Sequence, residues 1–326
     1  MPELPDIAVY IDALAPRVIG RTLVSARIRT PSLLRTFEPP LESVIGARVR
    51  TIERVGKRIA LGFERDRFLV IHLMIAGRLL WKPLGVKPKG KIDSAWLAFE
   101  SRGALDGANV ASDVAEGTLL LTEAGTRKRA SLHVLEGRDA LRGIDPGGID
   151  PLGCTVRAFS AALTRESRTL KRILTSPALF SGIGNAYSDE ILHAARLSPI
   201  KKSSSLTPDE IGRLFEATRS TLDLWTQRLR REFGLERGGP GRFPRAGEIT
   251  AFRPDFAVHG RFGKPCPACG STVQRIIRAD SEINYCATCQ NHGKLLADRS
   301  LSRLLKDDWP ETIEEWELGE GFGAGR

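Results

Sequence analysis

The spacing of apolar side chains changes twice along this chain. In the first stretch the apolar residues recur at helical spacing, which predicts a helix over 5–16. Pro5 suits the first turn of such a helix, and Asp6 lies near its positive end. The residues of the apolar face are Ile7, Tyr10, Ile11 and Leu14.

From Thr22 to about Leu135 the apolar residues gather instead in short runs, which Gly and charged residues separate. Several short strands divided by turn residues are typical of a β-sandwich or a barrel. The clearest runs are Val44–Val55, Arg58–Phe63, Phe68–Met74, Trp96–Phe99, Thr118–Thr122 and Leu132–Leu135. We therefore predict an N-terminal domain over 1–136, a β-sandwich with a helix in front of it.

A stretch rich in Gly, Pro and Asp at 137–153 marks the best domain boundary, and beyond it the apolar period becomes helical. The segments expected to be helical are 156–164, 168–179, 185–196 and 207–231. A loop with several Gly and Arg residues follows at 234–248. The sequence thus predicts an α+β protein of several domains. After the sandwich come a helical domain (151–248), a cysteine-bearing module (256–295) and a C-terminal extension (296–326).

The net charge of the chain indicates a binding partner. The 326 residues carry a net charge of +10, and a strongly basic chain suits a polyanion such as DNA. A solvated basic surface without a partner is the alternative. The apolar runs are too short to span a bilayer, and no signal peptide is evident at the N-terminus. We expect a cytoplasmic, nucleoid-associated monomer that does not bind membranes.

Four of the five cysteines form two CxxC pairs, Cys266 with Cys269 and, after sixteen intervening residues, Cys286 with Cys289. Two such pairs supply the four thiolates that zinc prefers in a tetrahedral site. We expect one structural Zn²⁺, because four sulfur ligands leave no open position for catalysis. The basic residues around the pairs, Arg278 among them, favour a finger that contacts DNA. A purely structural knuckle is the alternative.

Gly182-Ile183-Gly184-Asn185 precedes the helix expected at 185–196. Glycines let the backbone approach a phosphate, and the amides at a helix start can bind one. Asn185 could cap the helix or donate to a phosphate. An ordinary helix start explains the motif equally well.

The N-terminus offers a nucleophile. If the initiator Met is removed, Pro2 becomes a secondary amine, and an α-amino group that titrates near pH 8 is partly neutral at physiological pH. Glu3 lies next to it as a possible general acid. Taken alone, these residues are explained as well by an ordinary leader into a helix.

Together these motifs resemble the formamidopyrimidine-DNA glycosylase/endonuclease VIII family. The resemblance covers about residues 1–290 and keeps one order along the chain. The stretches that carry it are MPELPD at 1–6, Gly56-Lys57, His72-Leu73, GIGNAYSDEIL at 182–192, VHGRFGKPC at 258–266 and the two CxxC pairs.

The resemblance implies a sandwich and a helix–two-turn–helix domain that flank DNA, with the damaged nucleotide flipped out of the duplex. Pro2 would attack C1′ and displace the base, and Glu3 would protonate the sugar ring oxygen. The resulting iminium would allow β- and then δ-elimination, which cut the strand. Lys57 would hold a phosphate near the lesion, and Lys171 and Asn185 would grip phosphates from the helical domain.

Some positions depart from the family's pattern. Asp6 stands where the family usually has Glu, and it is a possible second acid. Ser281 stands at the position of the family's finger arginine. Arg278 is the candidate to take over the role of that arginine. The chain also continues beyond Gln290, the usual family end.

Lesion recognition departs further. The family's oxoguanine-type members fill the vacated stack with Met, Arg and Phe. Here Ile75 stands at the Met position with Met74 before it, and the loop 123–130 lacks the Arg-Phe pair. Arg127 and Arg129 are the candidates to enter the gap. The alternative is that the loop 123–130 is misaligned with the family's loop, in which case another residue would insert into the gap.

The sequence therefore predicts a bifunctional DNA glycosylase and abasic-site lyase of base-excision repair, acting on damaged or abasic DNA, duplex or single-stranded. One alternative is a non-catalytic protein of the same fold that binds damaged DNA. A general zinc-ribbon protein of transcription or translation is a second, but it gives no reason for MPELPD at the first residue.

Overall fold

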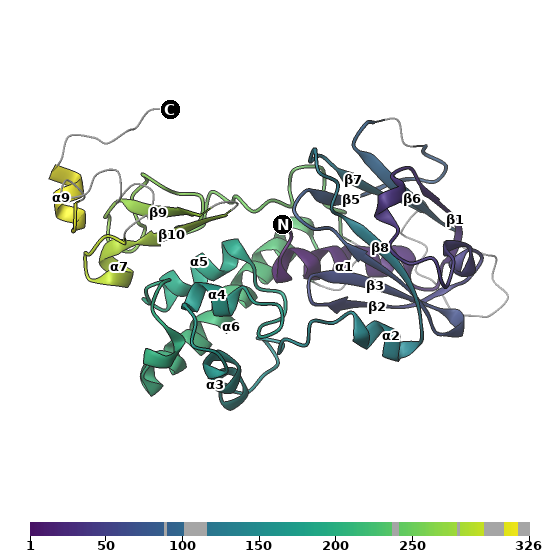
Figure 1. Cartoon of the computed structure of the whole chain (residues 1–326). Coiled ribbons are helices and arrows are strands. Elements are labelled where there is room, and N and C mark those ends of the chain that lie inside the picture. Colours follow the sequence, from purple (N-terminus) through teal and green to yellow (C-terminus); the bar gives the residue numbers. More distant parts are fainter. Residues whose placement is uncertain (88–89, 101–115, 237–240, 279–280, 297–309, 319–326) are drawn as a thin grey trace. The chain divides into compact units, whose positions relative to one another are not determined.

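The structure is a computed structural model that describes residues 1–87, 90–100, 116–236, 241–278, 281–296 and 310–318 (Figure 1). The chain divides into two compact units. The first unit is Met1–Pro146 with Leu224–Thr250, and the second is Gly147–Asp223 with Ala251–Arg326. In the ranges described, no helix has the length and apolar character needed to cross a membrane.

Helix α1 (Leu4–Val18) opens the first unit and confirms the helix expected at 5–16. It begins with a capping box, in which the Glu3 side chain accepts from the Asp6 amide and the Asp6 side chain accepts from the Glu3 amide. Each carboxylate thus satisfies an amide that would otherwise lack an intrahelical partner. The predicted apolar face is buried, with Ile7 and Leu14 fully inaccessible to solvent.

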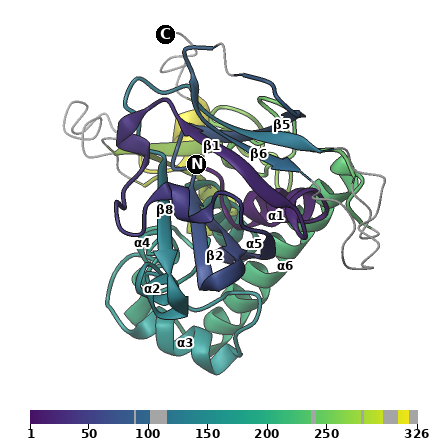
Figure 2. The same cartoon turned by 90° about the vertical axis from the view of Figure 1, so that its right-hand side faces the viewer.

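Two antiparallel four-stranded sheets form the predicted sandwich, in the orders β1-β6-β7-β5 and β2-β3-β4-β8 (Figure 2). The strands are β1 (Thr22–Ile28), β2 (Val49–Val55), β3 (Arg58–Phe63), β4 (Arg67–His72), β5 (Gly77–Pro83), β6 (Asp93–Glu100), β7 (Gly117–Glu123) and β8 (Ser131–Glu136). Apolar residues of both sheets and of α1 share one core.

The segment 224–250 belongs to the first unit, although the sequence placed it with the helical domain. Leu229, Phe233 and Ile249 are buried in the same core as α1 and the sandwich. Arg230 also pairs with Asp12 of α1, with 2.7 Å between Nε and Oδ2. The Gly- and Arg-rich composition of 234–248 is typical of a domain boundary. The ion pair of Arg230 nevertheless ties the segment 224–250 to a residue more than two hundred positions earlier in the chain.

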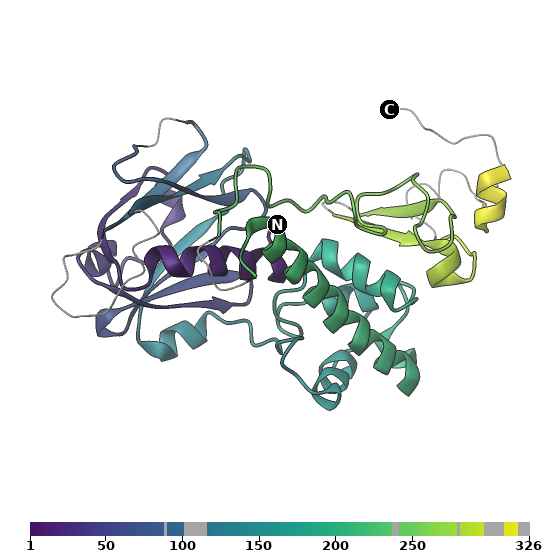
Figure 3. The same cartoon turned by 180° about the vertical axis from the view of Figure 1, so that it is seen from behind.

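The second unit contains the helices α3 (Val156–Thr164), α4 (Leu170–Leu174), α5 (Asn185–Ala194) and the first part of α6 (Pro208–Phe233), which is continuous in Figure 3. The helix expected at 168–179 is wrong in its extent, because α4 ends at Leu174. Pro177 follows within one turn and cannot continue a helix. The short helix α2 (Gly137–Gly143) lies where the sequence predicted only a linker.

The cysteine-bearing module is a hairpin of β9 (Val273–Arg278) and β10 (Ser281–Cys286), followed by α7 (Ala287–Asn291). Helix α9 (Ile313–Leu318) lies in the C-terminal extension. The predicted architecture of sandwich, helical domain and four-cysteine finger is therefore confirmed.

Candidate functional site

The start of α1 places a buried amine beside charged groups. Pro2 is buried, and Glu3 keeps only 3% of its surface exposed. Burial lowers the pKa of the Met1 α-amine; the negative charge of Glu3 opposes this shift, whereas Arg78 and Lys57 favour it. A buried setting of this kind favours the neutral form of an amine, which is the nucleophilic form.

Asp6 lies at this same helix start. Its Oδ2 accepts from the Glu3 amide at 2.9 Å, and only 2% of its surface is exposed. The shorter side chain of Asp is therefore used to fix the first turn of α1, which also carries Glu3. Its role as a second acid stays a prediction.

Lys57 follows Gly56 in the turn between β2 and β3, where Gly56 adopts a φ of +61°. His72 of β4 pairs in register with Arg58, the residue after Lys57. Burial, and after it the charges of Arg58, Lys57 and His133, lowers the pKa of His72 to about 4. The histidine is thus neutral at physiological pH, and the positive charges around it make this end of the sheet favourable for an anion.

The proposed gap-filling residues occupy the turn between β4 and β5. Met74 adopts a φ of +51°, and Ile75 is 58% exposed. The turn closes through a hydrogen bond from the Gly77 amide to the Leu73 carbonyl at 2.9 Å. An exposed Ile at a tight turn is available to contact another molecule.

The loop 123–130 is organised by the carboxylate of Glu123. Its Oε1 accepts from the amides of Arg129 at 2.7 Å and Ala130 at 3.0 Å. The side chains of Arg127 and Arg129 are exposed. The loop thus presents two cations on a fixed backbone, while their entry into a lesion gap stays a prediction.

In the second unit, Asn185 is the first residue of α5. Its Nδ2 donates to the Glu282 carbonyl of β10 at 3.0 Å. Lys171 is 5% exposed, and its Nζ lies 2.5 Å from both the Asn185 carbonyl and Asp189 Oδ1. These contacts assign Lys171 to the support of the Asn185 turn, and the phosphate contact expected of it stays a prediction.

Two acidic residues of α5, for which the sequence predicted no role, tie this helix to the cysteine module. Asp189 accepts from His259 at 2.7 Å and from the Asn284 amide at 3.2 Å. Glu190 accepts from three successive amides at 257–259. Burial raises the pKa of Glu190, although those three bonds oppose the shift. The one sequence signal was an acidic pair on a helix that is otherwise largely apolar.

The four cysteines of the finger converge on one point. Their Sγ atoms lie within 4.8 Å of one another, with 4.0 Å between Cys266 and Cys289 and 3.4 Å between Cys269 and Cys286. A tetrahedral ion with metal–sulfur bonds of about 2.3 Å separates its ligands by about 3.8 Å, so this cluster could hold one metal ion.

His193 of α5 supports the cysteine cluster from outside. Its Nε2 lies 3.2 Å from Cys266 Sγ. Burial, and then the charge of Arg196, lowers the pKa of His193, so the imidazole is neutral at physiological pH. A neutral ring that donates N–H to a ligand sulfur orients that ligand.

Arg278 and Ser281 face each other across the hairpin, at the ends of β9 and β10 nearest its turn. The side chain of Arg278 lies outside the described residues. Its substitution for the family's finger arginine therefore stays a prediction.

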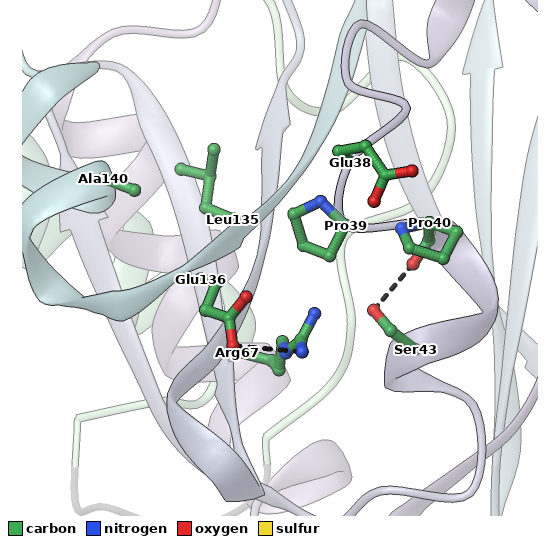
Figure 4. Close-up of a pocket in the computed structure, with 8 residues that line it drawn as sticks. All are labelled: Glu38, Pro39, Pro40, Ser43, Arg67, Leu135, Glu136 and Ala140. Carbon is green, nitrogen blue, oxygen red and sulfur yellow. Dashed lines mark hydrogen bonds and ion pairs between the residues drawn. The ribbon is translucent and has the colours of Figure 1, made fainter.

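A hollow of about 490 Å³ in the first unit lies away from these groups. Pro39, Pro40 and Leu135 form its apolar walls (Figure 4). Arg67 crosses it to pair with Glu136, with 3.1 Å between Nη2 and Oε1. None of the catalytic, DNA-binding or metal-binding residues predicted from the sequence lines this hollow.

The C-terminal extension packs on the finger. The Ile313 amide donates to the Gly293 carbonyl at 2.8 Å, and the Leu295 amide donates to the Glu311 carbonyl at 2.8 Å. Ile313 is buried together with Leu296 against residues of the hairpin, which are Ile276, Ile283 and Tyr285. Because side chains alternate along a strand, this is the face opposite to Cys286.

The comparisons with known proteins agree over most of the chain. Residues 1–111 match the family profile of the formamidopyrimidine-DNA glycosylase N-terminal domain, and 148–227 match that of the formamidopyrimidine-DNA glycosylase H2TH domain. The formamidopyrimidine-DNA glycosylase of Chloroflexus aurantiacus is 30% identical over 295 residues, which cover 89% of this chain and 98% of that protein.

Two solved structures share the fold. The MutM (Fpg) protein of Thermus thermophilus matches with a TM-score of 0.68 and 30% identity, over 89% of this chain and 98% of its own. The Lactococcus lactis Fpg in complex with DNA that contains an abasic site matches with a TM-score of 0.71 and 22% identity, over 89% of this chain and 99% of its own.

The packing of the extension gives a first prediction. Ile313→Asp places a charge in a buried apolar cluster, so we expect it to destabilise the docked extension by about 2–4 kcal/mol. Hydrogen exchange followed by mass spectrometry should then show faster exchange in 273–286 and 293–296. Glu314→Gln, at the exposed neighbouring position, is the matched control and should leave exchange unchanged. Equal exchange in both variants would contradict the docking.

Proposed function

The chain belongs to the formamidopyrimidine-DNA glycosylase family, and we propose that it is a bifunctional DNA glycosylase and abasic-site lyase of base-excision repair with the amine of Pro2 as nucleophile. The observation that carries this proposal is the burial of Pro2 at the start of α1, directly beside the buried carboxylate of Glu3.

The chemistry would begin when removal of Met1 exposes the Pro2 nitrogen. This secondary amine attacks C1′ of the flipped nucleotide, and the bond from C1′ to the damaged base breaks. Glu3 donates a proton to the ring oxygen, which leaves C1′ and opens the sugar. The amine gives up its own proton, which the departing base takes up, and an iminium links Pro2 to C1′.

The iminium then draws electrons from the neighbouring carbon. Loss of a C2′ proton expels the 3′ phosphate in β-elimination, and δ-elimination expels the 5′ phosphate. Water hydrolyses the remaining imine and returns the free Pro2 amine. A neutral amine is needed for the first step alone, and a buried position such as that of Pro2 favours the neutral form of an amine.

Binding of DNA would use separate cationic and polar groups in each unit. In the first unit Lys57 lies at a turn where other positive charges gather. In the second, Asn185 lies at the start of α5, where backbone amides favour a phosphate. Lys171 would act through Asn185, because it bonds the carbonyl of that residue. The exposed Arg127 and Arg129 add positive charge.

We also propose that the four cysteines hold one structural Zn²⁺. The donor set of four thiols within 4.8 Å of one another suits zinc, and it leaves no ligand position for substrate. The ion would fix the two knuckles that support the β9–β10 hairpin, and His193 would orient Cys266. No step of the reaction passes through this ion.

The nucleophile can be tested on abasic-site DNA. Borohydride should trap the mature protein on this DNA, and a leader peptide that blocks Pro2 should abolish trapping. Cleavage of the same fusion to leave Pro2 first is the matched control and should restore it. Trapping by the blocked protein would move the nucleophile to a lysine, and no trapping by the mature protein would favour a non-catalytic DNA-binding role.

Glu3→Gln separates the two activities. We expect base excision to fall by roughly a hundredfold or more, because acid assistance matters most while the sugar ring is closed. Nicking of a preformed abasic site should fall less, since that sugar is already partly open. Single-turnover rates on both substrates measure the ratio, and an equal loss in both would argue against this acid role.

The metal is tested by substitution of one ligand. Mass spectrometry under native conditions should find about one zinc per chain, and Cys266→Ser should release it and weaken DNA binding. Cys154→Ser, outside the cluster, is the control and should keep the metal. Full DNA binding by a metal-free protein would contradict a structural role.

Lesion choice follows from the residues available to fill the gap. We expect slow excision of 8-oxoguanine, faster action on abasic sites or oxidised pyrimidines, weak dependence on the opposite base and tolerance of single strands. Ile75 fills space but donates no hydrogen bond, and a bidentate Arg contact would add roughly 1–3 kcal/mol of discrimination. Rates with 8-oxoguanine opposite C and opposite A, beside an abasic control, measure this. Fast removal with strong preference for C would show that loop 123–130 provides a wedge.

A further inference from the structure

The β9–β10 hairpin has two faces, and each of them packs into a different small core. Side chains alternate along paired strands, so Val273 and Cys286 share one face while Ile276 and Ile283 share the other. On the first face, Val273 and Cys286 are buried together with Cys266. On the second face, the buried cluster is apolar and contains no cysteine. Only one of the two cores is therefore built on the cysteine cluster.

The second face is covered by the C-terminal extension. Leu296 and Ile313 are both buried against Ile276 and Ile283. Tyr285 lies on the same face with 1% of its surface exposed, and its Oη accepts from the Leu296 amide at 2.8 Å. The extension thus supplies apolar contacts to this face and also satisfies its buried hydroxyl.

Backbone hydrogen bonds fix the extension in this position. The Leu295 amide donates to the Glu311 carbonyl, and the Ile313 amide donates to the Gly293 carbonyl, both at 2.8 Å. Neither of these bonds involves a cysteine or a group that contacts one. The contacts of the extension with the hairpin therefore do not require a metal ion.

The first face has two supports of its own. One is the cluster of four cysteines, whose Sγ atoms lie within 4.8 Å of one another and would be linked by the ion. The other is helix α5, because Asp189 accepts from the Asn284 amide of β10 at 3.2 Å. Small metal-binding modules commonly unfold when the metal is removed, so the question is what holds this hairpin without it.

We propose that the extension is a second, metal-independent support of the finger, an inference that rests on the structural zinc proposed above. The β9–β10 hairpin then persists when zinc is lost, whereas the two cysteine knuckles do not. This matters for the second unit as a whole, because the Glu282 carbonyl of the hairpin is an acceptor for Asn185. A finger that keeps its hairpin keeps this partner for Asn185.

The test is hydrogen exchange followed by mass spectrometry, on the full chain loaded with zinc and on the same chain stripped by a chelator. Ile313→Asp disrupts the apolar contact of the extension, and Ile313→Ala weakens it without adding a charge. Glu314→Gln, at the exposed neighbouring position, is the matched control. Zinc per chain is measured in every sample, and peptides from α1 and α3 report whether the rest of the chain stays folded.

In the stripped wild type, exchange should rise by roughly a hundredfold in the knuckles (266–272 and 287–291) but by less than about tenfold in β9 and β10. In stripped Ile313→Asp, exchange in β9 and β10 should be roughly a hundredfold faster than in the stripped wild type. Ile313→Ala should change in the same direction by less. Zinc-loaded Ile313→Asp should keep part of its protection, since the ion still holds the other face, and Glu314→Gln should match the wild type in both states.

Equal exchange of β9 and β10 in the stripped wild type and in stripped Ile313→Asp would overturn the proposal. If both were unprotected, the extension would hold nothing without the metal, and if both were protected, α5 alone would hold the hairpin. Complete loss of protection in zinc-loaded Ile313→Asp would overturn it as well, because the metal would then contribute no support. A wild type that binds no zinc refutes the proposed metal instead. Slower exchange in the wild type than in Ile313→Asp would then still support the role of the extension, and equal exchange would refute it.

Discussion

A helix that begins inside a protein must satisfy its first amides without water, and this constraint shapes the first unit. Glu3 and Asp6 meet it by exchanging hydrogen bonds with each other's amides. Both carboxylates are nearly inaccessible to solvent, and burial lowers the pKa of the Met1 amine beside them. The same residues thus fix the helix and place two negative charges close to the N-terminus. Few substitutions here could alter reactivity without altering the fold.

In the second unit, the fully buried carboxylate of Asp189 has a similar structural role, because several segments of the chain bond to it. It accepts from Lys171, from His259 and from the Asn284 amide, which lie on three separate stretches of the chain. A buried charge with this many partners is expensive to disturb, because loss of one partner leaves the others desolvated and unpaired. The start of α5 and the finger hairpin are therefore held as one piece.

Local patterns predicted what local forces determine. The helix at the N-terminus, the strand-rich region and the four cysteines all follow from short-range spacing. The helix at 168–179 was overextended because apolar spacing continues past Leu174, although Pro177 ends it.

What the sequence did not predict depends on contacts between distant residues. Arg78 and Ile249 are 171 positions apart, and Asp189 and Asn284 are 95 apart. No periodicity in either partner indicates such a pair. The role of Glu190 was likewise not predictable from the sequence. Its carboxylate is an acceptor only because the fold brings the backbone amides at 257–259 next to it. The role proposed for Pro2 was suggested by resemblance, whereas its burial was evident only from the fold.

Burial of the helix start has a consequence for the order of events in biosynthesis. An aminopeptidase must take an extended N-terminus into its own active site before it can remove Met1. In the folded chain Met1 is partly buried, and Pro2 and the first turn of α1 are buried in full. Processing is therefore expected while the nascent chain is still emerging from the ribosome, before the sandwich has closed over its first helix. Under the proposed mechanism, a molecule that folds with Met1 in place would be well folded but unreactive. The active fraction of a preparation would then depend on the relative rates of methionine removal and of folding of the first unit.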